Sequence, residues 1–242
     1  MIKIFAFTIL VVFPVFSFEM KPAGIVNLHP IEKPEVKVIR DSVEGLWDNI
    51  RQQNPLLKKE VLSMAFKGYL KMIDDGLVEE GSPLTIVDFD LPSSEQRLWV
   101  IDVNNQKLEY ASLVAHGRNS GGLHAKKFSN MPESYMSSLG FYLTGETYFG
   151  KHGKSLRLDG MEKGINDNAR ARAIVMHAAA YAEKSFITRH GRLGRSLGCP
   201  ALPSDNFEAI IDLIKNKSCL FVHASEPDYW SQSDFIKENV LS

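Results

Sequence analysis

A single thiol in a glycine-containing loop is the strongest chemical signal in this sequence. Cys199 lies in the segment SLGCP at residues 196–200, and an apolar run at residues 174–176 leads directly into His177. A cysteine thiol is a weak nucleophile until a base removes its proton, and a neighbouring imidazole is a suitable base. Glycines let backbone N–H groups converge on the oxyanion that forms when the sulfur attacks a carbonyl. The pair predicts nucleophilic acyl transfer, with Cys199 as nucleophile and His177 as base.

Two arginines lie in the same glycine-rich stretch as the thiol. Arg192 and Arg195 fall within residues 191–198. A guanidinium group can hold a carboxylate through two parallel hydrogen bonds, so these side chains could bind an acidic group of a substrate. A solvated surface loop would have the same composition, and both interpretations stay open at this point.

The second cysteine bears on how the first one is used. Cys219 lies in an apolar segment, residues 218–222, which predicts a buried strand. A buried cysteine behaves as a small hydrophobic residue. We therefore expect Cys219 to belong to the core and Cys199 to be free. A disulfide between them is the alternative, because disulfides are common in exported proteins.

The N-terminus has the pattern of an export signal. Lys3 precedes an apolar stretch over residues 4–18, which has the length of a signal-peptide core and is shorter than the ~20 residues of a membrane span. We expect residues 1–17 to be a signal peptide, with no membrane span after its cleavage. The mature protein would then act in the periplasm or cell envelope. An uncleaved N-terminal anchor is the alternative.

Composition and spacing argue against two other kinds of site. The formal net charge is −1 and long basic runs are absent, so nucleic-acid binding has no support. His116, His124 and His152 lack the spacing of metal ligands, and we expect no metal or other cofactor. The stretch at residues 150–155 is similar to a phosphate-binding loop, but Tyr148 stands where that motif requires glycine.

Periodicity divides the chain into helical and β-rich parts. The first helix is expected to begin at Asp41 and to end at Asn54, where a proline follows. Strands are predicted over residues 84–89, 97–103, 108–115, 139–143, 155–158 and 220–223, and a helix over 206–214. The expected organisation is an extended leader at 18–40, a helical segment at 41–80, a catalytic domain at 81–225 and a C-terminal tail at 226–242. The fold class is α+β, mainly β.

A series of phrases in this order resembles one known family. They are IVDF at 86–89, VAHGRNSG at 114–121, FSN at 128–130, SSLGFY at 137–142, GKHG at 150–153, NDNAR at 166–170 and GRSLGCP at 194–200. With a histidine on a strand before the cysteine loop, the chain resembles the L,D-transpeptidase catalytic-domain family of bacterial cell-wall enzymes. The similarity is closer to the divergent, murein L,D-transpeptidase-like branch and covers roughly residues 84–224, with an extension into the helical segment.

The resemblance implies a β-sandwich-like catalytic domain behind the helical segment, and acyl transfer on peptidoglycan stem peptides. Cys199 would attack the carbonyl at the L-centre of the diamino acid of a tetrapeptide stem and form a thioester as D-alanine leaves. An amine of a second stem would then give a 3→3 cross-link. His177 would deprotonate the thiol and later protonate the leaving amine. The backbone N–H groups of Gly198 and Cys199 would stabilise the oxyanion, while Ser196 would shape the loop.

The sequence departs from the commoner family pattern beside the nucleophile. That pattern has histidine where Leu197 stands and arginine or asparagine where Ala201 stands. Recognition of the substrate carboxylate must then come from elsewhere in the chain. The candidates are Arg195, Arg192 and Arg118 for the carboxylate and Tyr181 for a wall of the pocket.

Two further functions stay open on the sequence alone. Water could resolve the same thioester, which would give an L,D-carboxypeptidase or a related amidase. A non-catalytic wall-binding protein could keep the fold without using Cys199. Oligomeric state has no signal in the sequence.

Overall fold

The computed structural model describes residues 34–237, so the predicted signal peptide and most of the predicted leader lie outside the described residues. The helical elements are α1 (Pro34–Gln53), α2 (Lys59–Asp74), a 3₁₀ turn (Ala180–Ala182), α3 (Lys184–His190), α4 (Phe207–Ile214) and α5 (Pro227–Gln232). The strands are β1 (Leu84–Asp88), β2 (Leu98–Asp102), β3 (Lys107–Ser112), β4 (Gly140–Gly150), β5 (Gly153–Gly160), β6 (Val175–Ala178), β7 (Ala201–Leu202) and β8 (Cys219–His223). One large sheet with short helices confirms the α+β fold class.

The described chain begins with two amphipathic helices. α1 starts at Pro34 and not at Asp41, so the end of the range predicted as an extended leader is helical. Proline suits a first helical turn, because the N–H that it lacks would have no partner there. α1 ends at Gln53, directly before the predicted break. Within residues 34–237, no helix combines the length and the hydrophobicity needed to cross a membrane.

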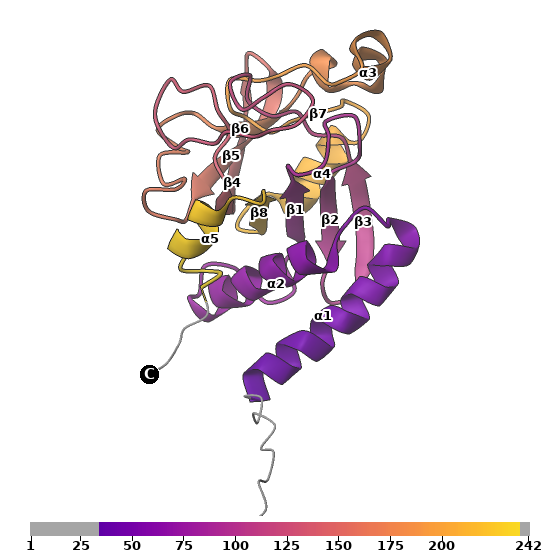
Figure 1. Ribbon diagram of the computed structural model, residues 1–242, viewed down its shortest axis with the longest axis vertical. Helices are drawn as coiled ribbons and strands as arrows, with labels where there is room; N and C mark the ends of the chain where they lie inside the picture. The colour runs from indigo at the N-terminus through magenta and orange to yellow at the C-terminus, as the bar shows by residue number, and fades with distance from the viewer. Residues whose placement is uncertain (1–33, 238–242) are drawn as a thin grey trace, which may run out of the picture. The chain divides into compact units, whose positions relative to one another are not determined.

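The second helix lies close to the sheet because it carries a glycine at the contact. A methyl group added to Gly68 would come within 2.1 Å of the Phe141 ring on β4. Phe141 in turn stacks on Phe221 of β8, with ring centroids 4.4 Å apart. α1 contacts β3, and α2 contacts β1 and β8 (Figure 1). The helical segment and the sheet therefore share one hydrophobic core.

All eight strands are hydrogen bonded into one sheet, in the order β3-β2-β1-β8-β4-β5-β6-β7. The family resemblance implied a β-sandwich-like domain, and in the structure its strands belong to one continuous hydrogen-bonded sheet. Figure 1 shows how these strands are arranged. β1 and β8 are parallel neighbours, and every residue of both is buried, as is typical of parallel strands inside a sheet that is covered on both faces. At one end of the sheet β6 pairs with β7, and His177 lies opposite Ala201. This pairing brings the predicted base next to the segment that carries Cys199.

Of the segment predicted as a tail at 226–242, the described residues 226–237 pack onto the domain through a buried carboxylate. Glu162 accepts hydrogen bonds from the Phe141 N–H at 2.7 Å, from the Tyr229 hydroxyl at 3.1 Å and from the Ser233 hydroxyl. Tyr229 lies on α5 and is itself buried. Burial raises the pKa of Glu162, although its hydrogen bonds act in the opposite direction. α5 is therefore part of the folded unit.

Candidate active site

The hydroxyl group of Ser196 holds the loop that carries Cys199. Ser196 Oγ donates to the Cys199 carbonyl oxygen at 2.6 Å and accepts the Gly198 N–H at 3.0 Å. Gly198 has a φ of +125°, a backbone conformation that L side chains rarely adopt. Ser196 and Gly198 together define the tight turn that presents the thiol.

This turn changes the expected source of the oxyanion donors. The Gly198 N–H is bonded to Ser196, so it cannot meet an oxyanion until that bond breaks. The backbone N–H of Cys199 has no hydrogen-bond acceptor in the described part of the chain. Of the two expected donors, the resting loop leaves only the Cys199 N–H available.

A second segment, residues 115–118, supports the cysteine loop. The Ser196 N–H donates to the His116 carbonyl oxygen at 3.0 Å, and the Arg118 N–H donates to the Ser196 carbonyl oxygen at 2.8 Å. The buried His116 ring accepts a hydrogen bond at Nδ1 from Arg97, at 2.8 Å. Burial, followed by the charge of Arg97, lowers the pKa of His116 to about 3. The ring is therefore neutral at physiological pH and accepts the Arg97 hydrogen bond, while the backbone carbonyl of the same residue supports the cysteine loop.

The Cys199 sulfur lies against the turn that precedes β6. The thiol donates to the Ala173 carbonyl oxygen at 3.7 Å, and the sulfur accepts the Val175 N–H at 3.5 Å. Burial raises the pKa of the thiol, whereas the Val175 N–H and the charge of Arg172 act in the opposite direction. The side chain of Cys199 is therefore a protonated thiol at neutral pH. Cys199 and Cys219 are both free, and Cys219 is fully buried in β8 as expected, so the alternative disulfide is not formed.

His177 is buried on β6, and a backbone carbonyl orients its ring. Nδ1 lies 2.9 Å from the Ala178 carbonyl oxygen, so Nδ1 carries the proton and Nε2 is left as the base. Burial lowers the pKa of His177, and the hydrogen bond to Ala178 opposes this effect. The His152 ring, from the turn between β4 and β5, stacks on His177 with centroids 4.4 Å apart. The imidazole is therefore neutral at pH 7 and fixed in orientation.

The predicted catalytic pair lies on neighbouring segments but is not hydrogen bonded. No hydrogen bond links the Cys199 sulfur to the His177 ring in the described part of the chain. The backbone N–H of His177 donates to the Pro200 carbonyl oxygen at 3.4 Å. The sulfur accepts its hydrogen bond from Val175, which lies two residues before His177. Two residues correspond to about 7 Å along a strand. Proton transfer requires the thiol to turn from Ala173 toward the ring, and such contacts commonly form only when substrate binds.

The four residues predicted to recognise substrate meet in one open groove of about 350 Å³. Its lining residues are Arg118, Tyr181, Phe186, Arg192, Gly194 and Arg195. The Tyr181 ring lies edge-on to His177, with centroids 6.5 Å apart. Burial, followed by the charge of Cys199, raises the pKa of Tyr181 to about 12. A neutral phenol therefore separates three guanidinium groups from the catalytic pair.

The arginines of the groove are held by neutral partners. Arg195 donates to the Gly121 carbonyl oxygen at 3.2 Å, Arg192 donates to the Leu193 carbonyl oxygen at 2.6 Å, and Arg118 lies 4.1 Å from the centre of the Tyr135 ring. The arginine–carboxylate pairs among residues 34–237 are made instead by Arg51, Arg157 and Arg170. The charges in the groove are therefore available to an anionic ligand.

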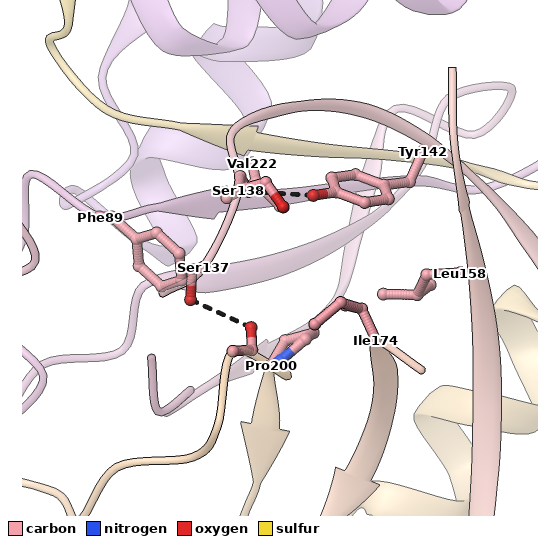
Figure 2. Close-up of a pocket in the computed structure, with 9 residues that line it drawn as sticks. Phe89, Ser137, Ser138, Tyr142, Leu158, Ile174, Pro200 and Val222 are labelled. Atoms are coloured by element: carbon pink, nitrogen blue, oxygen red, sulfur yellow. Dashed lines mark hydrogen bonds between the residues drawn. The ribbon is translucent and has the colours of Figure 1, made fainter. Parts of the chain in front are cut away.

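A small internal cavity lies behind the cysteine loop (Figure 2). Its volume is about 10 Å³, which is room for one water molecule and not for a substrate. At its wall the Ser137 hydroxyl donates to the Gly198 carbonyl oxygen at 3.2 Å, and the Tyr142 hydroxyl donates to the Ser138 carbonyl oxygen at 3.0 Å. The first of these bonds holds the cysteine loop at Gly198, and the second holds the neighbouring segment at Ser138.

Sequence reasoning missed three residues that the fold brings to the site. Arg172 and Ala173 lie in the turn before β6, and His152 was considered only as a metal ligand. Their contacts depend on chain segments far apart in sequence, which no local pattern reports. The nearest signal was the RAR run at residues 170–172, directly before the strand that ends in His177.

Potential metal ligands gather at a different place, where β1 and β8 end. Asp88, Asp90 and His223 each offer one ligand atom within 4.8 Å of the others. The Asp90 carboxylate already accepts the Ser225 N–H at 2.8 Å and the Ser225 hydroxyl at 2.6 Å. The chemistry available at Cys199 makes no use of this cluster.

Comparisons with known proteins agree with the nature of this site. A family model described as the L,D-transpeptidase catalytic domain matches residues 53–223. Among curated proteins no match was found. Similar solved structures include an L,D-transpeptidase from Mycobacterium smegmatis, at 14% sequence identity and a TM-score of 0.37, and the LD transpeptidase LdtMt1 in complex with imipenem, at 11% and 0.37.

The extent of these structural matches is partial. For the first two structures the match covers 59% of this chain and 59% of the other, so the chain spans less than two thirds of their length. An L,D-transpeptidase (Yku) from Stackebrandtia nassauensis is similar over 73% of this chain and 75% of its own, at 13% identity and a TM-score of 0.37.

Proposed function

Because this chain belongs to the L,D-transpeptidase catalytic domain family, we propose that it forms 3→3 cross-links in peptidoglycan through a thioester at Cys199. The observation that carries this proposal is the groove in which Arg118, Arg192 and Arg195 lie beside Tyr181 and His177. A peptidoglycan stem ends in carboxylates, and clustered guanidinium groups bind carboxylates in a defined orientation. Exposed arginines of a solvated loop would have no reason to meet in one groove beside the catalytic pair.

Acylation begins when the thiol turns from Ala173 toward the His177 ring. Nε2 of His177 takes the thiol proton, and the sulfur attacks the carbonyl carbon at the L-centre of the diamino acid. The carbonyl oxygen becomes an oxyanion, which the Cys199 N–H stabilises. Collapse of this intermediate breaks the C–N bond. D-Alanine leaves with the proton from His177, and the acyl group remains on the sulfur as a thioester.

Deacylation reverses the roles of the same groups. The amine of a second stem attacks the thioester carbonyl, and His177 accepts its proton. The C–S bond breaks, the proton returns to the sulfur, and a 3→3 peptide bond joins the two stems. The energy of the thioester drives this step, so the reaction needs no cofactor.

The experiment that tests this function incubates the purified chain with disaccharide-tetrapeptide and analyses the products by mass spectrometry. We expect cross-linked dimer and free D-alanine, and neither product from Cys199→Ala. Cys219→Ala is the matched control, because that thiol is buried away from the site. Tripeptide and D-alanine without dimer would assign the carboxypeptidase activity instead. Absence of all three products would refute the proposal.

A second measurement separates an enzyme from a non-catalytic wall-binding protein. A carbapenem should acylate the chain at one adduct per molecule, as seen in the intact mass. The adduct should disappear in Cys199→Ala and persist in Cys219→Ala. A chain that binds peptidoglycan but gives no adduct would support the wall-binding alternative.

We further propose that the protein works outside the cytoplasm, since its substrate is the cell wall and residues 1–17 have the pattern of a signal peptide. N-terminal sequencing of the protein from an envelope fraction tests this. A start after residue 17 supports cleavage, and an intact Met1 supports the uncleaved anchor.

A further inference from the structure

Arg172 is a half-buried cation that is bonded only to neutral groups. Nη1 donates to the Ser129 carbonyl oxygen at 2.7 Å and to the Ser138 hydroxyl at 3.0 Å. Nη2 donates to the Met136 carbonyl oxygen at 2.6 Å and to the Ser134 hydroxyl at 3.2 Å. Among residues 34–237, no carboxylate forms an ion pair with it. These four bonds fix the position of the guanidinium group and leave its charge uncompensated.

The fixed charge lies directly beside the cysteine loop. A methyl group placed on Gly198 would be 3.4 Å from Nη2 of Arg172 and 2.8 Å from the Met136 carbonyl oxygen. Gly198 precedes the nucleophile, so the guanidinium group packs against the backbone that holds Cys199. The thiolate form of Cys199 and the phenolate form of Tyr142 are the negative charges that interact with Arg172. Burial raises the pKa of Tyr142 to about 12, which leaves the thiolate as the anion accessible near neutral pH.

One turn links this cation to the sulfur. The Arg172 N–H donates to the Asn168 carbonyl oxygen at 2.8 Å, and the Ala173 N–H donates to the Arg170 carbonyl oxygen at 3.0 Å. Ala173 has a φ of +53°, unusual for a residue with a side chain. This backbone is the one whose carbonyl accepts the Cys199 thiol proton. The turn therefore sets the guanidinium group and the resting thiol in a fixed relation.

We propose that Arg172 is a positioning residue that holds a permanent positive charge beside the Cys199 sulfur and stabilises the thiolate once His177 has taken the proton. The inference deepens the proposed function and rests on Cys199 as its nucleophile. An opposite charge in a partly buried site favours an ionised form more than one in water does, because the local dielectric constant is lower.

Other charged and titratable groups around the sulfur act differently. Lys151 lies on the exposed turn between β4 and β5, and its charge is another that favours the thiolate. Solvent screens a charge in that position. His177 and Tyr181 are neutral at rest. Arg170, two residues before Arg172, is engaged by Asp159 and Glu146 and does not contact the cysteine loop.

The test measures the rate of Cys199 alkylation by iodoacetamide as a function of pH, with Cys199→Ala as the blank. In Arg172→Gln the alkylation rate at pH 7 should fall about tenfold, and the midpoint of the profile should move to higher pH. Arg172→Lys should recover much of this loss, because it keeps the charge. Arg170→Gln is the matched control and should follow the wild-type profile.

A second variant separates charge from loop geometry. The double substitution Ser134→Ala with Ser138→Ala removes two bonds of Arg172 and keeps its charge. It should lower thermal stability and leave the alkylation profile unchanged, and it tests the proposal even where Arg172→Gln does not fold. A shifted profile in the serine variant would overturn the assignment. So would a wild-type profile in folded Arg172→Gln, or identical profiles for Arg172→Lys and Arg172→Gln.

The alkylation rate reports on the Cys199 thiol and does not depend on activity toward peptidoglycan. A chain that fails to turn over tetrapeptide but shows the expected profiles would refute the proposed function and support the role of Arg172. Full cross-linking activity of the wild-type chain, together with a wild-type alkylation profile in Arg172→Gln, would support the proposed function and refute the role of Arg172.

Discussion

The proton on the Cys199 sulfur and the neutral ring of His177 set the starting point of the reaction. Burial raises the pKa of the thiol and lowers the pKa of the imidazole. Both shifts disfavour a preformed thiolate–imidazolium pair, which some cysteine enzymes use. The proton should therefore move to His177 only after substrate has bound, with His177 acting as a general base.

This protonation state predicts the pH dependence of the reaction. His177 must be neutral to act as base, so activity is present above its pKa and is lost as the pH falls through it. Burial holds that pKa below the ordinary value of 6.5. The acid limb of kcat/KM should therefore have its midpoint below pH 6.5, as measured by D-alanine release between pH 4 and 10. A midpoint above 6.5 would contradict this account. Without substrate, alkylation of the thiol should keep rising beyond pH 9.

We expect the Ser196 hydroxyl to be important for the conformation of the cysteine loop. Ser196→Ala removes the bonds to the Gly198 N–H and the Cys199 carbonyl oxygen. We expect a loss of about 1–2 kcal/mol in the free energy of unfolding and a drop of roughly tenfold or more in kcat. Urea denaturation and turnover of tetrapeptide measure the two effects. Ser185→Ala, on the exposed face of α3, should change neither, and an active Ser196→Ala enzyme would refute this role.

Among the elements, α2 and the β4–β5 hairpin have distinct tasks. α2 covers the centre of the sheet through the close contact of Gly68 with Phe141. The hairpin carries His152 to the other end of the sheet, where its ring covers His177. The first element contributes to stability, and the second orients the base and keeps it neutral.

The helix contact predicts a local steric cost. Gly68→Ala places a methyl group 2.1 Å from the Phe141 ring, so helix or ring must shift. We expect a destabilisation of about 1–3 kcal/mol in urea denaturation, although alanine favours helix more than glycine does. The control is Gly122→Ala, where an added methyl group meets open space. Equal stability of the two variants would show that α2 does not approach the sheet so closely.

The hairpin contact predicts a shift in the pH profile. Burial is the main cause that lowers the pKa of His177, and the charge of His152 acts in the same direction, while the His152 ring supports the imidazole by stacking. His152→Phe keeps an aromatic ring and removes the charge, so the acid limb of kcat/KM should move to higher pH with kcat largely retained. His152→Ala should also lower kcat, because the ring of His177 loses its support. An unchanged acid limb in His152→Phe would count against this contact.

Across the whole molecule, the buried carboxylate of Glu162 ties the C-terminal segment to the sheet. It accepts bonds from β4 and from residues in and after α5. α5 in turn contributes Tyr229, whose ring lies 6.4 Å from that of Phe221 on β8. The described part of the segment predicted as a tail therefore supports the core at β4 and β8, in the middle of the sheet.

Removing one partner of this carboxylate should destabilise the entire domain. Ser233→Ala leaves part of a buried carboxylate unsatisfied, which costs about 1–3 kcal/mol. Calorimetry should show a lower Tm with one cooperative transition. Ser231→Ala is the control, because that exposed serine bonds only to the Asp228 carbonyl oxygen. A separate low-temperature transition would show that the C-terminal segment melts independently of the sheet.

Local sequence was enough for the features that depend on one chain segment. The strand at 84–88 was predicted from its local pattern, and the apolar run around Cys219 predicted a buried strand, which the structure confirms. The helix at 207–214 and the end of α1 before Asn54 follow from periodicity and from proline. The loop of small residues around Cys199 predicted a nucleophile at this position, and that assignment stays a prediction. The start of α1 was missed, because residues 34–40 combine charges and a proline that an extended chain also tolerates.

The tertiary structure alone decided what surrounds the nucleophile. Contacts between segments such as 129–138, 172–175 and 196–199 decide three features of this site. They decide which N–H group faces an oxyanion, which carbonyl oxygen accepts the thiol proton and which cation lies beside the thiol. These contacts join residues far apart in sequence, and hydrogen bonds of this kind leave no period or motif. Sequence determined that a cysteine in a glycine-containing loop, a histidine on a strand and several arginines exist on an α+β scaffold. Only the packing of the sheet edge, with its turns in fixed register, determined which of them can act together.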